Sequence, residues 1–271
     1  MRNRGMVATH AVLATGAVAM VGPFVWQFLT SLKTLPHSVR VPPTVVPDGQ
    51  WSNYAKVFRL LPFGEQFLNT VAMTAARTLG QLLFCSLAAY AFARLRFPGR
   101  RVLFGLFLSV LMVPPQLFVI PQYQIIARLG WLNSLAALIV PGLFSAFGTF
   151  LLRQFFLGLP VELDEAARLD GASPLRIWWS VMLPLARPGL VALGILTALW
   201  SWNDFFWPLV VNNDPQKMTL SAGLASLQGQ FTTDYPVLMA GSLLACLPVL
   251  VIFVVLQRQF VEGIAFTGSK G

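Results

Sequence analysis

The chain has 271 residues, of which 56% are hydrophobic and 11% are charged, and its mean hydropathy is +0.69. Soluble domains carry about 25% charged residues, so this composition excludes an ordinary soluble domain and indicates a membrane protein. The net charge of +9 does not require a nucleic-acid partner, because basic residues also set membrane topology.

Six hydrophobic stretches are long enough to cross roughly 30 Å of hydrocarbon as helices. They cover residues 6–32, 67–93, 102–126, 135–156, 188–211 and 237–257. The first stretch follows Arg2 and Arg4, as in a signal peptide, but its apolar run continues too far for one. We therefore predict an all-α membrane protein with six transmembrane helices in one domain, residues 1–271, and an uncleaved first span.

The distribution of lysine and arginine predicts the orientation, because basic residues concentrate in cytosolic loops. With the N-terminus inside, the cytosolic segments hold twelve basic residues and the outer segments hold six. The loop from Arg94 to Arg101 is the clearest marker, with four arginines in eight residues. Both termini, the tail 258–271 and the loop 159–184 then face the cytosol. The loop 33–66 lies outside and forms either a structured cap or an irregular segment.

Polar side chains on the second span are candidates for a substrate pathway. Thr70, Thr74, Arg77 and Gln81 follow one another at spacings of four, three and four, so they share one helix face. A charged residue in a span usually faces the bundle interior or a wet cavity, although Arg77 could instead snorkel to the outer surface. An arginine in the pathway would suit an anionic group on the substrate.

The third and fifth spans supply further candidates. Two adjacent prolines precede Gln116 and Gln122 and should break the third span, either as a simple kink or beside a cavity. Asn203 and Asp204 lie near the outer end of the fifth span among tryptophans and phenylalanines. These aromatic residues form either an interfacial belt or, together with the polar pair, contacts to a sugar.

The polar stretch 159–184, LPVELDEAARLDGASPLRIWWSVMLP, separates the fourth and fifth spans. Acidic residues near its start suit the positive end of a helix dipole, Gly171 suits a left-handed helix stop, and Ser173 before a proline suits a new start. The stretch therefore predicts two short helices joined by a tight turn. Winding the first at 3.6 residues per turn places Leu163, Ala166 and Ala167 on one face, where the two alanines would let the backbone of another protein come close. Composition alone also fits an amphipathic connector on the lipid surface.

The spacing of Glu165-Ala166-Ala167, Gly171 and the run from Val181 to Pro184 resembles the EAA motif of ABC importer permeases. That pattern is E-A-A-x3-G-x9-I-x-L-P, and valine stands here where isoleucine is usual. The stretches 69–100 and 202–209 also resemble carbohydrate-type permeases. The resemblance covers most of the chain and best fits the MalG-like permease subunits of carbohydrate uptake ABC transporters.

This resemblance implies that residues 159–184 are a coupling loop that docks on an ATP-binding subunit. The residues implied in that contact are Glu165, Ala166, Ala167, Asp170, Gly171 and Pro184. The tail residues Gly268, Ser269 and Lys270 would contact the ATPase as well, although such a terminus otherwise frays. The candidates for the substrate pathway are Thr74, Arg77, Gln81, Gln116, Gln122, Asn203 and Asp204.

The implied partners are a homologous permease, ATP-binding subunits that carry ATP and Mg, and an extracytoplasmic solute-binding protein. The implied location of the chain is the bacterial inner membrane. The chain lacks the sequence GxxxxGKS/T and any metal-ligand cluster, so we expect no cofactor, no metal and no catalysis on it. Cys85 and Cys246 fall in hydrophobic runs and are expected to be core residues rather than a disulfide.

The implied substrate is a sugar or a related polar solute, with a glycerol phosphate derivative as an alternative. An ion-coupled secondary transporter is the rival class, but it usually has ionisable residues at the midplane. Here Asp204, near an outer end, is the sole carboxylate in a predicted span. A membrane enzyme would need a convergent set of nucleophile, base or metal ligands, and the sequence shows none.

Overall fold

The structure is a computed structural model that describes residues 2–229 and 233–268. Within these residues the regular structure is helical, apart from an isolated β-bridge between Gln228 and Thr233. The predicted all-α class is therefore confirmed. The chain forms two compact units, Met1–Gly64 with Gly223–Pro248 and Glu65–Ala222 with Val249–Gly271, which are described separately.

Helices that could cross a membrane occur throughout the described residues. Four helical segments are long and apolar enough, and they cover Val12–Ser31, Phe63–Arg94, Leu135–Gly158 and Tyr235–Ile252. Two bent pairs also pass by length and composition, so the described residues offer between four and six spans. In one pair Arg100–Met112 meets Pro115–Arg128 at 99°, because two adjacent prolines interrupt the backbone hydrogen bonds as predicted. In the other, Pro174–Leu185 meets Arg187–Trp202 at 81°.

The first unit contains α1 (Arg2–Ser31), α2 (Leu35–Ser38), α3 (Ser52–Leu60) and the first part of α15 (Tyr235–Gly268). Within it, α3 packs on α15, and a Cβ added to Gly241 would lie 3.5 Å from a Val57 methyl carbon. The helix α15 continues to Gly268, beyond residue 257, where the sequence predicts that the sixth span ends.

Polar contacts fix the loop between α1 and α3. Asp48 accepts a hydrogen bond from the backbone N–H of Thr34 at 2.8 Å and shares another with Nδ1 of His37 at 2.7 Å. The amide of Asn53 donates to the backbone oxygen of Ser31 at 2.9 Å. Because these bonds satisfy polar groups at the end of α1, the region is a structured cap and not an irregular loop.

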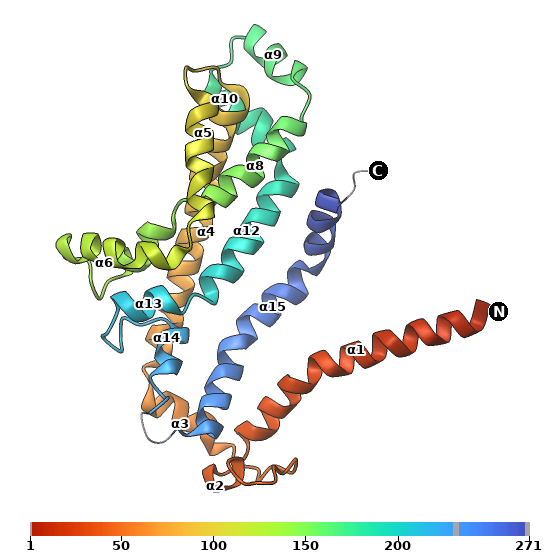
Figure 1. Cartoon of the computed structure of the whole chain (residues 1–271), viewed down its shortest axis with the longest axis vertical. Coiled ribbons are helices and arrows are strands. Elements are labelled where there is room, and N and C mark those ends of the chain that lie inside the picture. Colours follow the sequence, from red (N-terminus) through yellow and green to blue (C-terminus); the bar gives the residue numbers. More distant parts are fainter. Residues whose placement is uncertain (1, 230–232, 269–271) are drawn as a thin grey trace. The chain divides into compact units, whose positions relative to one another are not determined.

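The second unit is a bundle built on α4 (Phe63–Arg94), which has 32 residues. The helices that follow are α5 (Arg100–Ser109), α6 (Val119–Arg128), α7 (Leu135–Ile139), α8 (Ala146–Gly158), α9 (Glu162–Leu169), α10 (Pro174–Ile177), α11 (Leu183–Leu185), α12 (Arg187–Trp202), α13 (Phe206–Val211) and α14 (Leu220–Ala225). Figure 1 shows α9 at one end of this bundle, beyond α8 and α10. The stretch 188–211 is divided here, since α12 ends before α13 begins.

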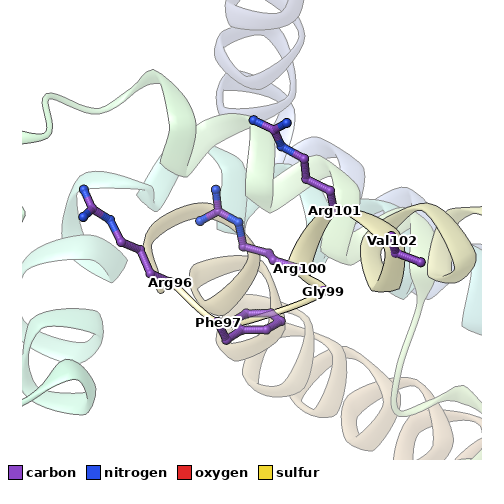
Figure 2. A pocket seen from close by; sticks show the side chains of 6 residues that line it. All are labelled: Arg96, Phe97, Gly99, Arg100, Arg101 and Val102. Carbon is purple, nitrogen blue, oxygen red and sulfur yellow. The ribbon is translucent and has the colours of Figure 1, made fainter.

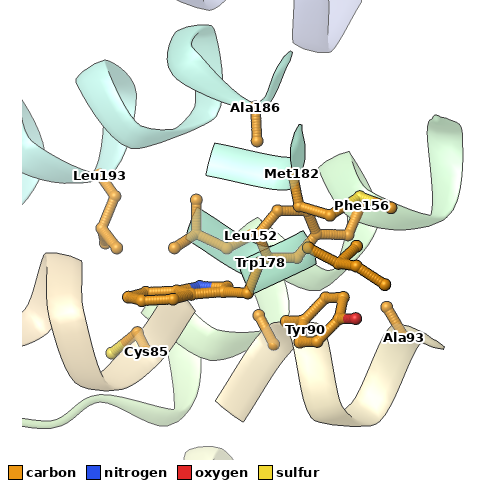
Figure 3. Close-up of a cluster of buried hydrophobic side chains, with 11 residues drawn as sticks. Cys85, Tyr90, Ala93, Leu152, Phe156, Trp178, Met182, Ala186 and Leu193 are labelled. Carbon is orange, nitrogen blue, oxygen red and sulfur yellow. The ribbon is translucent and has the colours of Figure 1, made fainter. Parts of the chain in front are cut away.

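The main core of the second unit lies where α4, α8 and the segment from α10 to α12 meet. Its buried residues are Cys85, Ala89, Tyr90, Ala93, Leu152, Phe156, Ile177, Trp178, Met182, Ala186 and Leu193. Figure 3 shows most of these side chains gathered around Trp178. Cys85 is a free thiol in this core. Cys246, which lies outside it, is also a free thiol. A Cβ added to Gly148 would lie 3.0 Å from Leu193 and 3.1 Å from the Cys85 sulfur, so this glycine permits close helix packing.

Candidate functional site

Residues 159–184 form the two short helices and the tight turn that the sequence predicts. The first turn of α9 carries Glu165 and other acidic residues, near the positive end of the helix dipole. Gly171 follows with a φ of +76°, a left-handed conformation that a side chain would strain. Ser173 then starts α10, and its Oγ accepts a hydrogen bond from the backbone N–H of Arg176 at 3.4 Å.

The second helix of this loop changes its winding before it reaches Pro184. After α10 the backbone follows a π-helical turn, Trp178–Met182, and then enters α11. Trp178 is 6% exposed and joins the core, whereas the neighbouring Trp179 is 65% exposed. Wide turns of this type recur at functional sites, and Pro184 is exposed just after this one.

Polar contacts attach α9 to the bundle. Asp164 is 5% exposed, its Oδ1 accepts a hydrogen bond from the Tyr90 hydroxyl at 3.3 Å, and its Oδ2 pairs with Arg168 at 2.8 Å. Arg94, at the end of α4, donates to the backbone oxygen of Leu159 at 2.6 Å, where α8 leads into the loop. Two sets of polar contacts therefore join α4 to the loop.

The face of α9 predicted to receive another protein is mostly open, and a different face packs on the bundle. Ala167 is half-buried against the core, but Leu163 and Ala166 are exposed. Asp164 takes the inward position because two partners bind its carboxylate. Sequence reasoning missed this residue, and the available signal was its spacing of four from Arg168, which permits an ion pair along the helix.

Large apolar side chains point away from the bundle on this loop. Leu169 is 89% exposed and Leu175 is 67% exposed, and the carboxylates of Glu165 and Asp170 are exposed on the same loop. A polar loop that exposes apolar side chains of this size has the character of a protein-docking surface.

A polar seam joins α4 to the C-terminal part of α12 and to the residues that follow it. It consists of Arg77, Gln81, Thr197 and Asp204. Arg77 is 7% exposed, pairs from Nη1 with Asp204 Oδ2 at 2.7 Å, and donates from Nε to the backbone oxygen of Leu138 at 2.7 Å. Oε1 of Gln81 accepts a hydrogen bond from the Thr197 hydroxyl at 3.0 Å. The seam thus contains a nearly buried ion pair between residues 127 positions apart.

Gly142 makes room for this seam. Its backbone oxygen accepts a hydrogen bond from Nε2 of Gln81 at 2.9 Å. A Cβ at this position would lie 2.5 Å from Nε of Arg77 and 2.6 Å from its Cδ. Any side chain here would therefore displace the arginine, so the close approach requires glycine.

The other pathway candidates lie outside the seam. Thr74 is buried, and its hydroxyl finds no hydrogen-bond partner among the described residues. Asn203 is exposed, and its amide donates to the backbone oxygen of Leu199 at 2.9 Å. Gln116 is exposed in the turn before α6, and Gln122 is half-buried within α6.

Two further site predictions concern metals and the tail. Within the residues described, no group of three or more His, Cys, Asp and Glu side chains is placed to hold a metal ion. Gly268 is the last residue of α15, whereas Ser269 and Lys270 lie outside the described residues. A contact between this tail and an ATPase stays a prediction.

Comparison with known proteins supports a transport role for these features. A family model described as binding-protein-dependent transport system inner membrane component matches residues 81–263. The sn-glycerol-3-phosphate transport system permease protein UgpE of Pectobacterium atrosepticum is 35% identical over 272 residues, or 97% of each chain. Its namesake in Escherichia coli is 34% identical over 268 residues, or 95% of each chain. A solved structure, a bacterial ABC transporter involved in the import of the acidic polysaccharide alginate, aligns with a TM-score of 0.80 and 26% identity over 95% of this chain and 96% of that chain.

Proposed function

This chain belongs to the binding-protein-dependent transport system inner membrane components, and from that premise we propose how it takes part in import. It is a permease subunit of an ABC importer, a multi-pass inner-membrane protein and not an enzyme. In the proposal it forms half of the translocation pathway, and a homologous permease forms the other half. A solute-binding protein delivers the substrate from outside. ATP and Mg bind to partner subunits, and both termini face the cytosol.

The construction of loop 159–184, from here on called the coupling loop, carries this proposal. The surface of the loop that faces away from the bundle exposes Leu169 and Leu175. The surface that faces the bundle is attached to α4 by the hydrogen bond between Asp164 and Tyr90. Transmission of movement needs a docking surface on one side and a firm attachment on the other. A subunit that binds the surface facing away from the bundle would therefore move α4 together with the loop.

In the proposed mechanism, ATP draws the ATP-binding subunits together and the coupling loop moves with them. The movement passes through Asp164 and Arg94 into α4, and the bundle switches between inward- and outward-facing states. Hydrolysis then resets the bundle. ATP can drive this switch only through a difference in affinity for the two states.

The proposed substrate is a sugar or a related polar solute, and the polar seam favours one that carries a negative charge. The names of the relatives given above refer to transport of sn-glycerol-3-phosphate and to import of an acidic polysaccharide, and both solutes carry negative charge. Arg77 is bound here by Asp204 at 2.7 Å, and a phosphate or carboxylate of the substrate would compete for the same guanidinium. The exposed amide of Asn203 would serve the hydroxyl groups.

The coupling role can be tested on a residue that the fold does not need. Leu169→Glu changes a side chain that is 89% exposed, and it should lower recovery of the ATP-binding subunit with this chain by about tenfold. Val46→Glu, at a site 71% exposed before α3, is the matched control and should leave recovery unchanged. Equal recovery with both variants would remove the coupling role.

The substrate assignment can be tested separately. Removing Arg77 alone would leave the Asp204 carboxylate without its partner at a partly buried site, so the double variant Arg77→Gln with Asp204→Asn is used. In the reconstituted complex it should lower uptake of sn-glycerol-3-phosphate by about tenfold or more relative to a neutral sugar. An unchanged ratio of the two uptake rates would show that Arg77 does not select the charge.

A further inference from the structure

The loop between α4 and α5 borders an open hollow, and three of its six lining residues are arginines. Its volume is about 340 Å³. The residues that line it are Arg96, Phe97, Gly99, Arg100, Arg101 and Val102. Figure 2 shows the three guanidinium groups extending to the same side of the loop. Gly99, with a φ of +75°, supplies the sharp bend that allows arginines before and after it to face one space.

The positive charge of this hollow is not balanced by nearby carboxylates. The three ion pairs found among the described side chains are His37–Asp48, Arg77–Asp204 and Arg168–Asp164, and none involves the loop. The neighbouring helix α8 contributes a further guanidinium to α5, since Arg153 stacks 4.3 Å from the ring centroid of Phe104. Like charges held together without counterions repel, so the arrangement favours binding of an anion.

The hollow lies between two candidate membrane spans. The helix α4 ends at Arg94, and the bent span that begins at Arg100 follows directly. Beyond the arginines, one side of α5 and of the turn that continues it is apolar and open: Leu103 is 50% exposed, Leu106 is 62% exposed and Val110 is 50% exposed. Their spacings of three and four place these side chains on one face of the helix.

We infer that this hollow binds the phosphate group of an anionic phospholipid, whose acyl chains lie along the exposed face of α5. Guanidinium groups bind phosphate oxygens through paired charge-assisted hydrogen bonds. Basic pockets at the membrane surface are suited to lipid headgroups, and each arginine strengthens the attraction by about fivefold. The apolar face is what distinguishes a lipid from free phosphate, because only the lipid would cover it.

The test uses the purified importer complex in nanodiscs of equal phosphatidylglycerol and phosphatidylcholine, followed by native mass spectrometry of the lipids retained. The variant is Arg96→Gln with Arg101→Gln. Arg100 is kept because its Nη1 donates to the backbone oxygen of Leu95 at 2.8 Å and holds the loop. The control, Arg40→Gln with Arg59→Gln, removes the same charge from exposed positions outside the hollow.

The wild-type complex should retain phosphatidylglycerol in preference to phosphatidylcholine. Because it lacks two arginines, the variant should lower that preference by about 25-fold, and the control should keep it within about twofold. If the variant and the control retain the same ratio, the hollow is not a lipid site. Inorganic phosphate at about ten millimolar should not displace the lipid, because phosphate makes no apolar contact. Displacement by phosphate would overturn the lipid assignment and leave a free-anion site.

Discussion

Replacement of Asp164 by alanine tests how firmly the coupling loop is attached to the bundle. The change removes the acceptor of the Tyr90 hydroxyl, and Tyr90 is 3% exposed. A buried donor left without a partner costs about 1–3 kcal/mol. The ion pair with Arg168 adds little, about 0.3–0.5 kcal/mol, because that side chain is 48% exposed and lies four residues along the same helix. We therefore expect the attachment of α9 to weaken by about 2 kcal/mol.

Hydrogen exchange measures this effect directly, since 2 kcal/mol corresponds to about a 30-fold change in the open population. The amides of α9 should exchange about that much faster in Asp164→Ala. In Arg168→Ala, which keeps the contact with Tyr90, they should stay within about twofold to threefold of the wild type. Unchanged exchange in Asp164→Ala would refute the attachment. In the assembled transporter, uptake per ATP hydrolysed should also fall. The loop would still bind the ATP-binding subunit through its exposed surface, but it would transmit less movement to α4.

Two further outcomes follow from geometry and charge. Gly142→Ala should lower the thermal stability of the purified protein by about 1–3 kcal/mol because its Cβ would displace Arg77, whereas Gly105→Ala, with no atom within 4 Å, should be neutral or slightly stabilising. The N–H of Thr34 is the main cause that lowers the pKa of Asp48 from its ordinary value of 3.8, although desolvation opposes it. A carboxyl with a lowered pKa stabilises the fold above its unfolded pKa and loses that contribution as the pH falls through the folded value. Protease resistance of the cap between α1 and α3 should therefore drop below about pH 4, and Asp48→Asn should be less resistant at pH 6 and show no such drop.

The parts of the fold that local chemistry controls could be predicted from the sequence. Gly171 and Ser173 mark the turn and the second helix start, and the structure has both. The prolines of the third span also break the helix where they occur. In these cases the cause lies within a few residues of the effect, so a single sequence contains it.

What could not be predicted depends on partners far along the chain. The inward position of Asp164 requires Tyr90, which is 74 positions away. The spacing of polar residues places Arg77 on one face with Gln81, but no local pattern identifies Asp204 as its partner across 127 positions. A helical wheel based on hydrophobicity places every carboxylate on the exposed face. It therefore misplaces a carboxylate such as Asp164, which a second helix binds through a hydrogen bond.

The continuity of α4 has a consequence for how far a small displacement at the coupling loop can reach. Tyr90 and Arg77 belong to the same unbroken helix, and thirteen residues at 1.5 Å each make a lever arm of about 20 Å. A tilt of about 5° pivoting near Tyr90 would carry the arginine about 1.7 Å sideways over that length. Directed away from Asp204, this movement would lengthen their 2.7 Å contact to about 4.4 Å, beyond hydrogen-bonding range. The rigidity of one helix is thus enough to carry a displacement at Tyr90 to the ion pair of Arg77.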